Sequence, residues 1–159
     1  MPAPTWVFDS SAIIQIKSAI TYADRPHVFA SMARLVSVGR LRFPARVLDE
    51  LSRHRDQAHD WAKSHAAAAS EGEPSLDEVK DVLAVVPDII DPGKDSGADE
   101  ADPYVLAMAA KLRAAGTDAR VVTQEFKDLP SKLSLNTAAG MLGIPSVPLK
   151  GFLRAEDIS

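Results

Sequence analysis

The chain has 159 residues, of which 46% are hydrophobic and 25% are charged, and its formal net charge is −4. This balance is typical of a single soluble globular domain, which we expect to span residues 1–159, and the absence of cysteine excludes disulfide frameworks, thiolate zinc sites and cysteine nucleophiles. No apolar run reaches the ~18 residues needed to cross a bilayer and no signal peptide is evident, so we expect a cytoplasmic protein without membrane contact.

The first half of the chain alternates short apolar runs with apolar residues at helical spacing. Residues 6–8 are apolar and stop at Asp9, which predicts a buried strand followed by a turn. The helix after this turn would be capped by Ser10 or Ser11. The other elements predicted in this half are a helix over residues 28–38, a strand over residues 40–43, and helices over residues 45–53 and 56–65.

The second half contains clear helix-start and helix-stop signals. Ser75 followed by Glu78 forms a capping box, and Pro103 and Gly116 bracket an apolar helical pattern. The elements predicted here are helices over residues 76–90 and 103–115, a strand over residues 120–123, a short helix over residues 136–142, a possible fourth strand over residues 144–147, and a final helical turn over residues 149–154.

Strands that alternate with helices predict an α/β fold with a mostly parallel sheet covered on both faces. In such sheets, binding and catalytic sites form beyond the carboxyl ends of the strands. Asp9 and Thr123 both lie at predicted strand ends of this kind. We therefore expect the functional site at this edge of the sheet.

Acidic residues lie near several predicted element ends, where a parallel sheet places its cleft. They are Asp9 after the first strand, Glu50 after the second, Asp99 and Asp102 at the start of a helix, and Glu125 after the third strand. If three or four of these carboxylates converge, a cation or protons must relieve their repulsion. Oxygen ligands favour hard cations such as Mg²⁺ or Mn²⁺, which can activate water for phosphodiester cleavage.

Each of these acids also has an ordinary structural explanation. Asp9 could be a turn or capping residue, Glu50 a solvated helix residue, and Glu125 a loop charge. Asp102 precedes Pro103, a pattern expected of a helix N-cap followed by proline at the first helical position. From the residues alone, these explanations stay open beside the metal-ligand hypothesis.

Several stretches of the chain together resemble a known superfamily. In chain order they are VFDSSAII, FPARVLDEL, GADEADPYVLAMAAKL and VVTQEF. Their order and spacing resemble the PIN-domain superfamily across almost the whole chain, and more narrowly a PIN-like branch long labelled uncharacterised, similar to VapC-type toxin ribonucleases. The closing LNTAAGMLGIPSVPLKGFL also looks like the tail of that branch.

The resemblance implies a three-layer α/β/α PIN-like fold whose central sheet has four to five mostly parallel strands. It implies a metal-dependent endoribonuclease that holds Mg²⁺ or Mn²⁺ on acidic residues. Carried onto this sequence, the metal ligands would be Asp9, Glu50 and Asp102. Asp99 is the alternative third acid, because an Ala-Asp pair occurs at both places.

The fourth acidic position departs from the pattern of the superfamily. An aspartate usually lies two residues after the strand-end threonine, whereas here Thr123 is followed by Gln124 and Glu125. The resemblance therefore implies Glu125 as a fourth catalytic acid with a longer side chain. It also implies that Ser11 and Thr123 orient carboxylates or water by hydrogen bonds.

The expected partner is an RNA substrate. Basic residues cluster locally in spite of the acidic net charge, and Arg42, Arg46 and Arg53 are candidate phosphate contacts. A toxin of this kind would have a cognate antitoxin protein that occludes its cleft, and a homodimer is a further expectation. The alternative is a catalytically silent PIN-like module that binds RNA or a protein partner, which the glutamate at the fourth position keeps open.

Overall fold

The computed structural model describes residues 2–53, 55–90 and 100–159. Within these residues, four strands form one parallel sheet in the order β2-β1-β3-β4. The strands are β1 (Thr5–Phe8), β2 (Leu41–Arg42), β3 (Ala119–Val122) and β4 (Ser146–Val147). Every residue of the central strand β1 is buried, as expected for a parallel sheet with both faces covered. The prediction of a mostly parallel sheet of four to five strands is confirmed.

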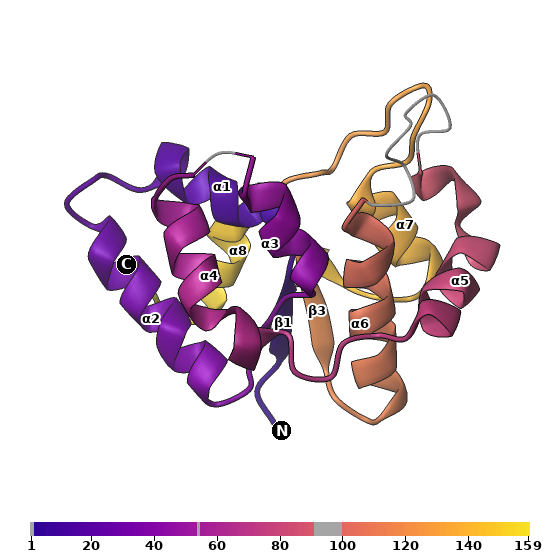
Figure 1. Cartoon of the computed structure of the whole chain (residues 1–159), viewed down its shortest axis with the longest axis horizontal. Helices are drawn as coiled ribbons and strands as arrows, with labels where there is room; N and C mark the ends of the chain where they lie inside the picture. The colour runs from indigo at the N-terminus through magenta and orange to yellow at the C-terminus, as the bar shows by residue number, and fades with distance from the viewer. Residues whose placement is uncertain (1, 54, 91–99) are drawn as a thin grey trace.

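Helices cover both faces of this sheet, which gives the expected three layers. Figure 1 shows α1 to α4 and α8 on one side of the strands and α5 to α7 on the other. The helices are α1 (Ser10–Ala19), α2 (Arg25–Ser37), α3 (Ala45–Leu51), α4 (Gln57–Ala69), α5 (Leu76–Val85), the 3₁₀ turn η1 (Pro87–Ile89), α6 (Asp102–Ala114), α7 (Leu135–Met141) and α8 (Leu149–Ala155). Among the described residues, no helix has the length and apolar character that a bilayer span requires.

Several element boundaries differ from the sequence prediction for local reasons. The strand expected over four residues is only two residues long, because the Phe43 N–H donates to the Ala69 carbonyl at the end of α4. The helix expected over residues 76–90 ends at Val85, since Pro87 cannot continue its hydrogen bonding. Helix α4 instead extends four residues beyond its predicted end, through a run of alanines that favours helix.

Aromatic contacts fix α8 and α4 in the core. Phe152 packs edge-to-face against Trp6 and Phe8, with ring centroids 5.3 and 4.8 Å apart. All three side chains are fully buried, and burial of each contributes about 1.5–3 kcal/mol. On α4, the Trp61 indole N–H donates to the Phe29 carbonyl at 3.0 Å. The helices beside the sheet are therefore held by contacts from residues far apart in the chain.

Parallel pairing brings the carboxyl ends of β1 and β3 to the same edge of the sheet. Phe8 is in register with Val122, so the next residues, Asp9 and Thr123, lie side by side. The Asp9 N–H donates to the Val122 carbonyl at 3.0 Å, which fixes this junction. Helix α6 packs against both strands and begins with Asp102 at the same edge.

Candidate metal centre

Asp9 lies immediately after β1 and is 1% exposed. Its carboxylate caps α1 by accepting from the Ser11 N–H at 3.4 Å, so the prediction that Ser10 or Ser11 is the cap was wrong. The hydroxyls of Ser11 and Thr123 each donate to Asp9 Oδ2 at 2.7 Å. The Ser10 hydroxyl lies 3.3 Å from Oδ1 but only 2.6 Å from Glu50, and it has one hydrogen to give. Asp9 Oδ1 therefore retains acceptor capacity.

Asp102 is the first helical residue of α6, and the cap is Ala101, so the N-cap alternative for Asp102 is wrong. The carboxylate is 3% exposed, and its Oδ2 accepts no well-aligned hydrogen bond from the described residues. The Lys132 ammonium lies 2.9 Å from this oxygen at an ion-pair distance. Burial, followed by the negative charges of Asp9 and Glu125, raises the pKa of Asp102 well above its ordinary value.

Glu125 is the third carboxylate of the cluster. Its N–H donates at 3.0 Å to Thr123 Oγ1, the same hydroxyl that donates to Asp9. Burial, followed by the charge of Asp9, raises the pKa of Glu125 to about 7. A carboxyl group that resists ionisation is expected where acids converge without a bound cation.

Asp9, Asp102 and Glu125 each place a carboxylate oxygen within 4.8 Å of the other two, and we call these three residues the acidic trio. Burial raises the pKa values of Asp102 and Glu125, and repulsion between carboxylates at this separation adds to the effect. Asp102 Oδ2 is buried without a well-aligned hydrogen bond from the described residues, with the Lys132 ammonium 2.9 Å away, and Asp9 Oδ1 accepts the Ser11 N–H at the long distance of 3.4 Å. The trio fits a metal ion, and its all-oxygen donor set suits a hard cation.

Glu50 lies beside the acidic trio and is held by two donors. Its Oε1 accepts from the Ser10 hydroxyl at 2.6 Å, and its Oε2 accepts from the Ala101 N–H at 3.3 Å. These bonds connect α3 to the starts of α1 and α6. The charge of Glu50 also contributes, as a smaller cause, to the raised pKa of Glu125.

The grouping differs from the ligand set that the resemblance implied. That set was Asp9, Glu50 and Asp102, with Glu125 as the fourth acid. In the part of the chain that the structure describes, Glu125 joins Asp9 and Asp102 in the trio. The role of Glu50 as a metal ligand stays a prediction, and Asp99 lies outside the described residues.

Comparison with known families assigns the whole of this architecture to one group. A family model described as "Domain of unknown function (DUF4411)" matches residues 6–159, a span that contains the acids described above and every element except the first residue of β1. The chain belongs to the DUF4411 family. Comparison with curated proteins finds no match.

Sequence reasoning missed Lys132, a cation at the edge of the trio in this DUF4411 domain. Its ammonium lies 2.9 Å from Asp102 Oδ2 and 3.2 Å from Glu100 Oε2. Burial disfavours the charged amine, but the carboxylates of Asp102, Glu125 and Glu100 outweigh burial and raise the pKa of Lys132 above its ordinary value. The sequence contains no spacing that links this lysine to the acids, because it lies in an irregular segment between β3 and α7.

The three arginines proposed as phosphate contacts differ in their surroundings. Arg42 donates to the carbonyls of Glu71 at 2.8 Å and Gly39 at 3.3 Å, so its guanidinium supports the loop after α4. Arg46 lies over the Tyr104 ring at 5.0 Å, one helical turn before Glu50 on α3. Arg53 is exposed just after α3. A contact of any of them with RNA stays a prediction.

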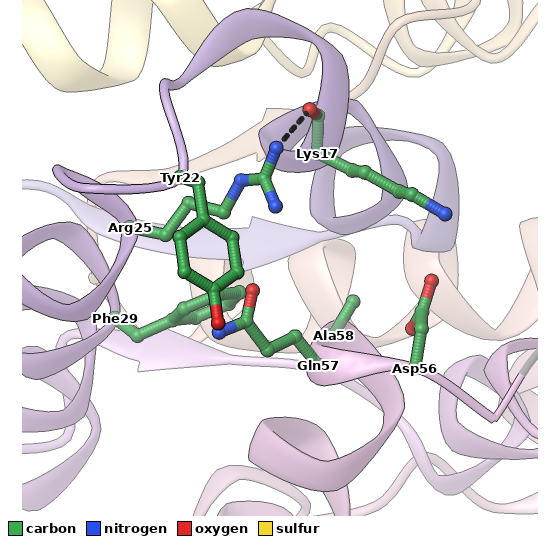
Figure 2. Close-up of a pocket in the computed structure, with 7 residues that line it drawn as sticks. All are labelled: Lys17, Tyr22, Arg25, Phe29, Asp56, Gln57 and Ala58. Carbon is green, nitrogen blue, oxygen red and sulfur yellow. Dashed lines mark hydrogen bonds between the residues drawn. The ribbon is translucent and has the colours of Figure 1, made fainter.

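A pocket of about 280 Å³ lies elsewhere in the DUF4411 domain and contains none of the acids of the trio. Figure 2 shows its lining at the end of α1, on the loop before α2, on α2 itself and at the start of α4. The residues are Lys17, Tyr22, Arg25, Phe29, Asp56, Gln57 and Ala58. Arg25 donates to the Lys17 carbonyl at 2.8 Å and so closes the end of α1. The chemistry of ionisable groups therefore places the candidate site at the trio, not at this pocket.

Proposed function

We propose that this DUF4411 domain is a metal-dependent endoribonuclease that cleaves RNA phosphodiester bonds. The observation that supports the proposal is the grouping of Asp9, Asp102 and Glu125 within 4.8 Å at the carboxyl edge of a parallel sheet. Sites of open α/β proteins form at this edge, and an all-carboxylate cluster suits Mg²⁺ or Mn²⁺. The resemblance of the motifs to PIN domains supplies the reaction and the substrate class.

In this proposal the acidic trio holds the ion, and Glu50 completes the acidic set from α3. A bound ion of this type supplies a Lewis acid that polarises a phosphoryl oxygen and activates water. The Ser11 and Thr123 hydroxyls both donate to Asp9 Oδ2 and thereby fix the orientation of the carboxylate that would hold the ion. A carboxylate of the set takes the proton from the attacking water, since no histidine lies in these motifs.

The substrate and partners in the proposal rest on the resemblance. RNA would approach from the α3 side, with Arg46 and Arg53 as phosphate contacts. The Arg42 guanidinium already donates to the carbonyls of Gly39 and Glu71, which it would have to leave in order to bind a phosphate. We further propose that the protein is the toxin of a toxin–antitoxin pair in the cytoplasm, with an antitoxin protein that covers the trio, and that it forms a homodimer.

The deciding experiment is cleavage of labelled single-stranded RNA and DNA by the purified protein, with Mn²⁺, Mg²⁺ or EDTA. We expect RNA cleavage that requires the metal and that Asp9→Asn reduces to background. Asp49→Asn is the matched control, because Asp49 is an exposed carboxylate on α3 next to Glu50. If metal-dependent cleavage is unchanged in Asp9→Asn, the proposed mechanism is wrong. If only DNA is cleaved, the assignment of RNA as the substrate is wrong.

One observation favours a second candidate function, a catalytically silent module that binds RNA or a protein. The Lys132 ammonium already neutralises part of the acidic cluster without a metal ion. A silent scaffold should bind neither Mg²⁺ nor Mn²⁺ in a calorimeter. Binding of Mn²⁺ that disappears in Asp9→Asn and Asp102→Asn would exclude this candidate.

A further inference from the structure

Lys132 is held in place by its own backbone as well as by its charge. Leu129 and Lys132 form an antiparallel bridge with reciprocal N–H to carbonyl bonds of 2.9 and 3.2 Å. The neighbouring Leu133 N–H donates to the Asp88 carbonyl at 2.9 Å, and the Ser134 N–H donates to Asp128 at 2.8 Å. These bonds fix the segment that delivers the ammonium to the acidic cluster.

Burial of the Lys132 ammonium costs free energy unless carboxylates pair with it. The Lys132 side chain is only 16% exposed, and a buried ammonium without carboxylate partners would lose much of its hydration. Its two partners, Glu100 and Asp102, are 12% and 4% exposed at their side chains. The three charged groups therefore form one desolvated ionic cluster, in which each group depends on the others.

One ammonium does not balance the acids around it. Glu100 and the acidic trio offer four carboxylates, and Glu50 is a smaller contributor to the same field. The Lys132 ammonium lies on Asp102, at one margin of the trio, and within the described residues its ion pairs are those with Glu100 and Asp102. The remaining negative charge can attract a second cation, and that cation would meet Lys132 at Asp102.

We propose that Lys132 is a built-in counter-ion of the metal centre, and that a divalent cation must displace its ammonium from Asp102 in order to bind. Lys132 then acts as a positioning residue: it keeps Asp102 in place before the metal arrives and limits how tightly the metal is held. Glu100 would retain the ammonium after displacement, because its carboxylate lies 3.2 Å away. The inference rests on the metal centre of the proposed function, but not on cleavage of RNA.

Electrostatics predicts the direction in which the metal affinity should change when the charge of Lys132 is removed. Removal of a metal ligand usually weakens metal binding, whereas removal of a competing positive charge strengthens it. A divalent ion and an ammonium that share one carboxylate repel one another even at the dielectric constant of water. Loss of the Lys132 charge should therefore tighten Mn²⁺ binding by about tenfold or more.

The test is calorimetric titration of Mn²⁺ into metal-free Lys132→Met, Lys132→Arg and Lys127→Met. Lys127 is the matched control, because it is an exposed lysine in the same segment between β3 and α7. We expect Lys132→Met to bind Mn²⁺ about tenfold more tightly than wild type, and Lys132→Arg and Lys127→Met to resemble wild type. Unchanged or weaker binding by Lys132→Met overturns the inference.

A second measurement keeps the result clear if Lys132→Met is poorly folded. Thermal unfolding in EDTA should give a lower Tm for Lys132→Met, and Asp102→Asn should recover part of that loss in the double variant, because the uncompensated carboxylate is removed. Purely additive changes in Tm contradict the counter-ion role. If Lys132→Met binds Mn²⁺ more tightly but no RNA cleavage is found, only the proposed function is wrong. If Mn²⁺-dependent RNA cleavage is found but Lys132→Met binds Mn²⁺ with unchanged affinity, only the counter-ion inference is wrong.

Discussion

The Thr123 hydroxyl donates to Asp9 Oδ2 at 2.7 Å across a separation of 114 residues. The Thr123 Oγ1 also accepts a hydrogen bond from the Glu125 N–H at 3.0 Å. One fully buried hydroxyl therefore fixes the side chain of one acid of the trio and the backbone of another. The contact exists because the parallel register of β1 and β3 ends both strands at one level.

Replacement of Thr123 by valine should weaken both the fold and the site. The variant keeps the shape of the side chain but leaves a buried carboxylate oxygen and a backbone N–H without this partner, at a cost of about 1–3 kcal/mol in the free energy of unfolding. Loss of a hydrogen bond behind a metal ligand should also lower Mn²⁺ affinity or RNA cleavage by about 10–100-fold. Urea unfolding and calorimetry measure the two effects. Thr123→Ser, which keeps the hydroxyl, should stay near wild type, and equal behaviour of the two variants would contradict the prediction.

The contribution of Glu125 to the stability of the metal-free protein should fall as pH rises. The pKa of Glu125 is raised from its ordinary value of 4.5 to about 7, so the folded state binds more protons than the unfolded chain between these values. Its stabilising effect is thus fully present below about pH 4.5 and is lost as pH approaches and passes 7. Allowing for solvent screening of a partly exposed group, wild type should lose about 1–2 kcal/mol more than Glu125→Gln across this window.

Urea unfolding of wild type and Glu125→Gln in EDTA, at several pH values across the window, measures this difference. Saturating Mn²⁺ should remove it, because a bound cation favours the ionised carboxylate. Parallel pH profiles for the two proteins in EDTA would show that Glu125 is not desolvated beside Asp9.

Removal of divalent metal should lower the thermal stability of wild type. A ligand present at 100 times its Kd stabilises the folded state by about 2.7 kcal/mol, which corresponds to a rise of several °C in Tm for a domain of this size. Asp102→Asn should abolish the rise that Mn²⁺ produces, while Asp49→Asn should preserve it. Differential scanning fluorimetry with Mn²⁺ and then EDTA tests this, and an equal rise in Asp102→Asn would place the ion elsewhere.

Substitution of Arg46 should affect RNA binding, whereas substitution of Arg42 should affect the stability of the fold. Arg46→Ala should weaken RNA binding and reduce the slope of log affinity against log salt concentration by about 1, as expected for a lost phosphate contact. Arg42→Ala should leave that slope unchanged and lower the free energy of unfolding by about 1 kcal/mol, because two carbonyls lose a donor. Fluorescence anisotropy with labelled RNA over a series of salt concentrations distinguishes them. If the two variants exchange these effects, the assignment of Arg46 is wrong.

Local patterns in the sequence predicted most of the fold. Local signals act within a few residues, so they can be recognised from the sequence without a structure. Examples are the apolar run before Asp9, the capping box at Ser75 and Glu78, and the proline and glycine around α6. The errors lie where distant residues intervene. The second strand is shortened by a bond from Phe43 to the end of α4, which no local pattern encodes.

The sequence also determined that Asp9 stands at the carboxyl end of a strand, because it follows an apolar run directly, and that Glu125 comes soon after the next predicted strand end at Thr123. Only the tertiary structure decided how they are grouped: it joins Glu125 to Asp9 and Asp102, and it gives Glu50 hydrogen bonds to Ser10 and Ala101. It also brings Lys132 to the cluster from an irregular segment without periodicity. The physical reason is that charges interact through space over a few ångströms, and sequence spacing does not measure that distance once the chain has folded back on itself.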